Sequence, residues 1–212
     1  MNALIGKQID RYRILEQLGM GGMATVYKAF DTRLERNVAI KVIRAGMADE
    51  NFLKRFELEA KSLAQMDHPN IVKVLDYGDF ENLPYLVMVY LSGGTLKRML
   101  GSPMPYDQAA RLLQPIAQAL DYAHQLRIIH RDVKPANILL TSNGLPMLSD
   151  FGIAKIIEAG SSLHLTSTGM GIGTPEYMAP EQWLGNVVPQ TDIYSLGVVF
   201  YEMVTGRRPY IA

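Results

Sequence analysis

Apolar and polar residues alternate in three short stretches near the start of the chain. These stretches are Tyr12 to Gly19, Ala24 to Phe30 and Asn37 to Ile43, and turn-forming residues separate them. Alternation of β-branched and aromatic residues with a period of two is typical of strands, so we expect three antiparallel strands here. Val72 to Tyr77 and Tyr85 to Tyr90 predict two more strands further along the chain.

A helical pattern interrupts these strands from about Asp49 to Met66. Its apolar residues share one stripe with the spacing of a buried face: Phe52, Phe56, Leu63 and Met66. Glu59 falls on the same stripe. Because an inward carboxylate is costly without a cation beside it, the periodicity predicts a buried partner for Glu59. The alternative is that Glu59 lies at the solvent edge of the stripe.

After Ser92-Gly93-Gly94, which breaks the chain as a linker would, the pattern becomes mainly helical. Tyr106 to Leu126 has helical periodicity, although Pro115 lies inside it. A proline in the interior of a helix costs roughly 3 kcal/mol or bends the helix.

A hairpin is predicted further on, because Ile138-Leu139-Leu140 and Met147-Leu148 flank Asn143-Gly144. The longest apolar run, Ile193 to Val204, is interrupted by polar residues and is too short to span a bilayer. We interpret it as a core helix.

Composition excludes few functions. The chain has 212 residues, 48% of them hydrophobic and 20% charged, with 21 Lys and Arg against 21 Asp and Glu. This balance gives no reason to expect nucleic acid or an anionic membrane as partner. The absence of cysteine excludes disulfides and Cys-based zinc sites and fits a reducing compartment. Since no signal peptide is visible between Met1 and Arg13, a cytoplasmic location is expected.

Two features of the strand region suggest phosphate chemistry. The glycine-rich run Gly19 to Ala24 lets backbone N–H groups approach phosphate oxygens, although most such hairpins are simply turns. A dinucleotide-binding fold would require a helix after the glycines, whereas Ala24 to Tyr27 continues as strand. Lys41 projects from the same strand face as Ala39. A lysine at a strand edge is normally solvated, but Glu59 offers it a partner.

The run His130 to Asn137 carries the strongest chemical signal. Asp132 can face a substrate hydroxyl, Lys134 a transferring phosphate and Asn137 a metal ion, which are three needs of phosphoryl transfer. His130 follows two apolar isoleucines, so we expect a packed, hydrogen-bonded core residue rather than a base.

Asp150-Phe151-Gly152 follows a predicted strand and places a carboxylate where a hard cation such as Mg²⁺ could bind, although an ordinary Asp-x-Gly turn is the alternative. The segment from Ile153 to Thr174 has several Ser, Thr and Gly residues and no clear periodicity.

The order of these motifs, followed by Ala179-Pro180-Glu181 and Asp192 to Gly197, resembles that of the protein kinase family from about Tyr12 to the end. The resemblance implies an α+β, two-lobed kinase fold over residues 12–212. Residues 12–91 would form a small lobe with an antiparallel sheet and one helix. Residues 92–212 would form part of a mainly helical lobe that lacks its last helices.

The same resemblance implies a role for each polar site residue. Lys41 would contact the α- and β-phosphates of ATP and be held by Glu59, Asp132 would accept or orient the substrate hydroxyl proton, and Lys134 would steady the γ-phosphoryl group. Two residues would bind Mg²⁺ or Mn²⁺: Asn137 and Asp150.

The nucleotide would lie between the lobes. The residues expected to contact it are Leu18, Gly19, Gly21, Val26, Ala39, Met88, Val89, Leu91 and Leu139. The backbone C=O of Val89 and N–H of Leu91 would read the adenine, and Met88 would guard the rear of the pocket. Many relatives have an acidic residue where this chain has Val89, but a main-chain contact tolerates that change. Ala24 replaces the third glycine of the loop.

Lys134 and Thr174 resemble the serine/threonine branch of the family, so protein serines and threonines are the expected substrates. Arg131 marks members activated by a phosphate on the segment before Thr174. Thr166 and Thr168 are the candidate positions, with Ser167 next, and the alternative is that they are solvated linker residues.

Ile9 to Tyr12 and Met23 to Tyr27 are most similar to bacterial eukaryote-like serine/threonine kinases. Such proteins often continue into a linker, a transmembrane helix and an external sensor, and they can form homodimers through the small lobe. The resemblance also implies that Asp192 hydrogen-bonds the catalytic-loop backbone and that Glu181 pairs with an arginine beyond this chain. A nucleotide-binding pseudokinase scaffold, and a fragment without independent activity, are the rival interpretations.

Overall fold

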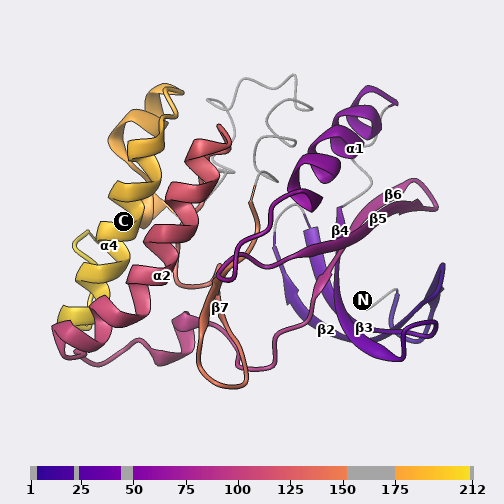
Figure 1. Cartoon of the computed structure of the whole chain (residues 1–212), viewed down its shortest axis with the longest axis horizontal. Helices are drawn as coiled ribbons and strands as arrows, with labels where there is room; N and C mark the ends of the chain where they lie inside the picture. Colours follow the sequence, from indigo (N-terminus) through magenta and orange to yellow (C-terminus); the bar gives the residue numbers. More distant parts are fainter. Residues whose placement is uncertain (1–3, 22–23, 44–49, 152–174, 211–212) are drawn as a thin grey trace. The chain divides into compact units, whose positions relative to one another are not determined.

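The computed structural model describes residues 4–21, 24–43, 50–151 and 175–210. These residues form two compact units, which we describe separately. The first unit holds the described residues up to Asp67 together with Lys73–Tyr90, and the second holds His68–Val72 and the described residues from Leu91 onward. Figure 1 shows the sheet elements in the first unit and most of the helices in the second.

A six-stranded antiparallel sheet forms the first unit, in the order β1-β2-β3-β4-β6-β5. The strands are β1 (Gln8–Ile9), β2 (Tyr12–Met20), β3 (Ala24–Asp31), β4 (Arg36–Ile43), β5 (Val74–Phe80) and β6 (Leu83–Val89). The five predicted strands are confirmed, with shifts of up to three residues at their ends. Strand β1 was not predicted, because two residues are too few to show alternation.

One face of this sheet is a hydrophobic core. Its buried side chains come from alternate positions of β2, β3, β4 and β6: Tyr12, Ile14, Tyr27, Ala29, Val38, Ile40, Val42, Tyr85 and Val87. Because side chains alternate across a strand, the residues between them lie on the opposite face. Directly paired residues share a face, so Val26 and Lys41 lie on this second face, as do Ala39 and Met88.

Helix α1 (Glu50–Ala64) packs against β5 and β6. The predicted apolar stripe is confirmed, because Phe52, Phe56, Leu63 and Met66 are all buried. Glu59 is half-buried. The helix is also linked to β5 by a long hydrogen bond of 3.4 Å from the Tyr77 hydroxyl to Glu57 Oε1.

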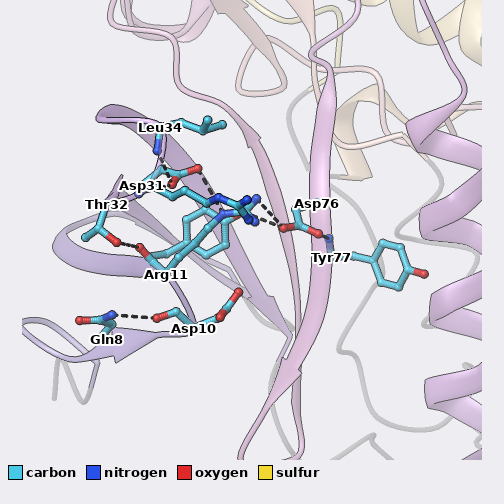
Figure 2. A network of polar contacts seen from close by, with 10 residues as sticks. Gln8, Asp10, Arg11, Asp31, Thr32, Leu34, Asp76 and Tyr77 are labelled. Atoms are coloured by element: carbon cyan, nitrogen blue, oxygen red, sulfur yellow. Dashed lines mark hydrogen bonds and ion pairs between the residues drawn. The ribbon is translucent and has the colours of Figure 1, made fainter.

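Arg11 lies at the centre of a polar network that joins β2, β3 and β5 (Figure 2). Its guanidinium contacts Asp76 Oδ2 at 2.8 Å and Asp31 Oδ2 at 3.4 Å. Tyr12 also donates to Asp76 Oδ2, at 2.8 Å. Burial is the larger cause, and this bond the next, of a raised pKa of Tyr12. The network was not predicted, because its members lie far apart in the sequence.

Asp31 is fully buried within this network, with 1% of its surface exposed. Burial alone would raise the pKa of its carboxyl group. However, backbone N–H groups of Leu34 and Arg33 each donate to Oδ1 at 3.0 Å, and Arg11 lies beside Oδ2. These donors outweigh desolvation, so the pKa of Asp31 lies below its usual value.

The second unit is mainly helical. Its elements are the short 3₁₀ segment η2 (Leu96–Met99), helix α2 (Tyr106–Gln125), strands β7 (Ile138–Leu140) and β8 (Pro146–Leu148), the 3₁₀ segments η3 (Pro175–Tyr177) and η4 (Pro180–Leu184), and helix α4 (Pro189–Thr205). Helix α2 packs against α4 and β8. It continues through Pro115, as the sequence pattern predicts.

The predicted hairpin is confirmed, since β7 pairs antiparallel with β8. Its loop spans residues 141–145, so it is longer than a two-residue turn. The Thr141 N–H donates to the Leu145 carbonyl at 2.9 Å, and the Leu145 N–H donates to Thr141 Oγ1 at 3.0 Å. Gly144 has a φ of 79°, the left-handed conformation that favours glycine.

Helix α4 differs from the prediction of a core helix. Val198, Val199 and Met203 are buried, but Ile193, Phe200 and Tyr201 are exposed. The apolar run therefore forms an amphipathic helix in the described part of the chain. Within that part, no helix combines the length and the apolar character required to cross a membrane.

Candidate active site in the loop between α2 and β7

Asp132, Lys134 and Asn137 converge in the loop that connects α2 to β7. Lys134 Nζ lies 2.8 Å from Asp132 Oδ2, and Asn137 Nδ2 donates to the same oxygen at 3.0 Å. Asn137 Nδ2 also donates to the backbone carbonyl of Asp132 at 2.8 Å. The structure thus brings together the three side chains for which the sequence predicts phosphoryl-transfer chemistry. One carboxylate oxygen, Asp132 Oδ2, receives both donors.

His130 packs beneath this cluster and is fully buried. Its Nδ1 accepts the Asp132 N–H at 3.2 Å, so the proton lies on Nε2, which donates to the Ser149 carbonyl at 2.7 Å. The ring also meets Phe151 edge to face, with 4.6 Å between the centroids. The prediction of a packed, hydrogen-bonded His130 is therefore confirmed.

Asp192, in the first turn of α4, holds the backbone at the start of the loop. It is buried, and its two oxygens accept the N–H groups of His130 and Arg131, each at 2.8 Å. His124 Nε2 lies 2.8 Å from Asp192 Oδ2. These are the contacts that the kinase resemblance implies for Asp192, reached across 61 and 62 residues of sequence.

Gln182, which like Asp192 follows the loop in the sequence, also holds this backbone and was not predicted. Its Nε2 donates to the Arg131 carbonyl at 2.9 Å, while its Oε1 accepts the Ala179 N–H at 3.1 Å. A Gln three residues after the residue that begins a helix is a known capping signal, and this pattern could have indicated the contact to Ala179. No local pattern could have indicated the contact to Arg131, which lies 51 residues away.

Ser149 links the loop to Asp150. Its N–H and Oγ both donate to the Asn137 carbonyl, at 2.9 Å and 3.0 Å. Asp150 follows with a φ of 70° and is half-buried. Non-glycine residues seldom adopt this conformation. The two residues expected to bind Mg²⁺, Asn137 and Asp150, are therefore tied to each other through Ser149.

The predicted nucleotide residues of the first unit lie on its sheet. Gly19 pairs with Val26, which in turn pairs with Lys41, and Ala39 pairs with Met88. The Gly21 N–H donates to the Ala24 carbonyl at 2.9 Å. Leu18, at the end of β2, is 45% exposed.

Two other predicted nucleotide residues, Leu91 and Leu139, belong to the second unit, where Leu139 forms an isolated bridge with Thr95. Val89 ends β6 in the first unit, and its N–H donates to the Lys73 carbonyl at 3.1 Å. Thr166 and Thr168 lie outside the described residues.

The segment before α4 is tied to that helix. Tyr177 donates to Glu202, and burial together with this carboxylate raises the pKa of Tyr177. Ser195 Oγ donates to the Tyr177 carbonyl at 2.7 Å. Glu181 is half-buried and accepts the Thr191 hydroxyl at 2.8 Å. Within this chain, Glu181 therefore has a hydrogen-bond donor.

Comparison with known proteins agrees with this arrangement. The model of the protein kinase domain family matches residues 12–212, and the chain belongs to that family. The solved PknI kinase domain of Mycobacterium tuberculosis has a similar fold, with a TM-score of 0.76 and 30% identity over 97% of this chain and 79% of that one. The predicted α+β kinase fold is confirmed.

Among curated proteins, the chain is similar to bacterial serine/threonine kinases. It is 46% identical to the serine/threonine-protein kinase PknB of Mycobacterium leprae over 210 residues, which are 95% of this chain and 33% of that protein. It is 43% identical to PrkC of Bacillus subtilis over 212 residues, 98% of this chain and 32% of that one. The chain thus spans about a third of the length of these relatives.

Proposed function

We propose that this chain transfers the γ-phosphoryl group of MgATP to serine and threonine hydroxyls of proteins. The observation that carries the proposal is the convergence of Lys134 and Asn137 on one carboxylate oxygen of Asp132. The relatives compared above are named serine/threonine-protein kinases, which supports the same reaction. The presence of these residues argues against a pseudokinase scaffold.

Asp132 is the group that accepts or orients the proton of the attacking hydroxyl. About a quarter of its side chain is exposed, so a substrate can reach it. Lys134 and Asn137 hold the carboxylate in one orientation before the substrate arrives, which reduces the reorganisation needed at the transition state. Lys134 then offers its charge to the γ-phosphoryl group.

The donor set fits Mg²⁺ or Mn²⁺. Asn137 uses Nδ2 for both of its contacts with Asp132, so its amide oxygen Oδ1 is directed away from Asp132. Amide and carboxylate oxygens are ligands that these hard cations prefer, and Asp150 supplies the carboxylate. Bound Mg²⁺ would neutralise charge on the phosphate oxygens of ATP.

Nucleotide binding is assigned to both units. Lys41, supported by Glu59, would contact the α- and β-phosphates, and the N–H groups of Gly19 and Gly21 would approach the phosphate chain. The common sheet face of Val26, Lys41, Ala39 and Met88 supports this assignment, because it presents apolar and cationic groups together. Leu18, Val89, Leu91 and Leu139 would complete the adenine site.

The regulation and context of the reaction are also proposed. Autophosphorylation at Thr166 or Thr168 would activate the domain, which would act in signal transduction in the cytoplasm, where MgATP is available. A second copy of the chain, paired through the first unit, is a further proposed partner. Analytical ultracentrifugation would detect the pair as a concentration-dependent rise in mass, and a monomer at all concentrations would exclude it.

The direct test is incubation of the purified chain with labelled MgATP and dephosphorylated casein. The unchanged chain is expected to label serine and threonine, whereas Asp132→Asn should lose at least about a hundredfold in rate, the scale of a general-base contribution. Asp121→Asn, an exposed change of the same kind on α2, is the matched control. Equal labelling by the unchanged chain and Asp132→Asn would contradict the proposal.

A further inference from the structure

We propose that Gln182 is a positioning residue for phosphoryl transfer, because its side-chain amide fixes the peptide that aims Asp132. This inference rests on the proposed function above. It concerns a contact between η4 and the loop that carries Asp132, both within the second unit.

The peptide between Arg131 and Asp132 is held at both of its polar groups. Its carbonyl, from Arg131, accepts Gln182 Nε2 at 2.9 Å, and its N–H, from Asp132, donates to His130 Nδ1 at 3.2 Å. A planar peptide fixed at both groups can no longer rotate about its neighbouring bonds. The direction in which the Asp132 side chain leaves the backbone is therefore determined by these two contacts.

Arg131 needs this support because its φ is 70°, in the left-handed region. Residues with a Cβ avoid that conformation unless their surroundings impose it. Here the Arg131 N–H donates to Asp192 and the Arg131 carbonyl accepts Gln182. Two side chains from distant parts of the sequence thus hold the unfavourable conformation. Asp192 provides one of them, and Gln182 provides the other.

The identity of residue 182 separates this role from simple helix capping. Gln182 Oε1 accepts the N–H of Ala179, the residue immediately before η4, and either Gln or Glu can make that contact. Only the amide can also donate to the Arg131 carbonyl. With a carboxylate at this position, lone pairs would face the carbonyl oxygen. Glu would therefore preserve the cap and remove the contact to the catalytic loop.

The space beside this contact is small. A cavity of about 10 Å³, lined in part by Gln182, Asp132 and Ser195, is the space beside the contact. That volume corresponds to about one water molecule. One water molecule there could donate to the Arg131 carbonyl, but unlike Gln182 it would not link that carbonyl to η4.

The test uses the full chain and the variant Gln182→Glu, assayed with MgATP and dephosphorylated casein. At about pH 8, where a carboxyl group is ionised, we expect kcat to fall about tenfold while KM for ATP stays within roughly twofold of the unchanged chain. As the pH is lowered towards about 6, a carboxyl group facing a carbonyl gains a proton and becomes a donor. The kcat of the variant, relative to the unchanged chain at each pH, should therefore recover.

Two further variants complete the design. Gln118→Glu, on the exposed side of α2, adds the same charge and should show neither the loss nor the recovery. Gln182→Met removes donor and acceptor without adding charge, so it should lose kcat at every pH. If Gln182→Glu does not fold, Gln182→Met alone decides, and full activity of that variant would overturn the inference.

The inference is also overturned if Gln182→Glu keeps its kcat at the higher pH, or if its loss does not depend on pH. In those cases Gln182 only caps η4, while the proposed function stands because the unchanged chain is active. An unchanged chain that transfers no phosphate would overturn the proposed function itself, and the positioning role with it.

Discussion

Asp31 in the first unit and Asp192 in the second are nearly identical in their bonding. Each is 1% exposed, each accepts two backbone N–H groups, and each lies beside a basic side chain, Arg11 or His124. They differ in what they hold. Asp31 binds the N–H groups of residues two and three positions later, whereas Asp192 binds a loop about sixty residues earlier.

This difference separates support of the fold from support of the reaction. The turn that Asp31 holds carries no predicted site residue, and the Arg11 network around it lies within the first unit. The loop that Asp192 holds carries Asp132 and Lys134, which remain partly exposed. The same carboxylate chemistry therefore stabilises a turn in one unit and, in the other, holds the loop that carries the proposed catalytic residues.

The largest effect is expected from Asp192→Asn, which should lower the rate of phosphoryl transfer. The two N–H groups of His130 and Arg131 bind different oxygens of Asp192, whereas an amide has only one oxygen that can accept. The loop should therefore shift. A displacement of about 1 Å at a reactive group costs on the order of a hundredfold in rate. Steady-state kinetics should show this loss in kcat even where circular dichroism reports a folded chain. A kcat close to that of the unchanged chain would remove the distinction between the two aspartates.

Asp31→Asn should act on stability instead. Loss of charge-assisted bonds from Arg33, Leu34 and Arg11 should lower the free energy of unfolding by about 2 to 3 kcal/mol. Urea titration followed by circular dichroism measures this change. The kcat of the folded variant should stay within roughly twofold of the unchanged chain, since no site residue depends on this turn. A large loss of kcat without a loss of stability would mean that Asp31 supports the reaction rather than the fold.

Acid should weaken the Asp31 contacts. Because the pKa of Asp31 is lower in the folded chain than in the unfolded chain, its contribution to stability is complete above the unfolded pKa of about 3.9. That contribution is lost as the pH falls through the lower, folded pKa. Between about pH 5 and 2, the melting temperature of the unchanged chain should therefore fall more steeply with decreasing pH than that of Asp31→Asn. Parallel curves would show that Asp31 is not preferentially ionised in the folded state.

The smallest effect is expected at an exposed aspartate, Asp107, which pairs with Arg111 on the surface of α2 at 2.6 Å. The hydrogen bond from Arg111 lowers the pKa of Asp107, but solvent and salt screen the pair. Asp107→Asn should change the melting temperature by less than about 1 °C in differential scanning calorimetry. A shift in melting temperature as large as that of Asp31→Asn would mean that burial does not explain why Asp31 stabilises the chain more than Asp107 does.

Much of this architecture follows from local patterns. Alternation predicted the strands of the sheet, helical periodicity predicted α1 and α2, and the run from His130 to Asn137 predicted the cluster of Asp132, Lys134 and Asn137. The packing of His130 was predicted because two isoleucines precede it. In each case neighbouring residues carry the information, since a strand or helix repeats its contacts within a few positions.

The remaining features depend on contacts between distant residues. Gln182 reaches Arg131 across 51 residues, and Arg11 reaches Asp76 across 65. No period or motif in one sequence reports such pairings, because they arise when separate elements pack. The exposed face of α4 was also missed, since a continuous apolar run does not reveal which side is covered.

The most direct measurement of the central claim is the rate of phosphoryl transfer to dephosphorylated casein by Asp132→Asn and Asp31→Asn, compared at saturating MgATP and at a temperature where both are folded. We expect Asp132→Asn to be slower than Asp31→Asn by at least about a hundredfold. Equal rates in the two variants would contradict the assignment of Asp132 to the reaction and of Asp31 to the fold.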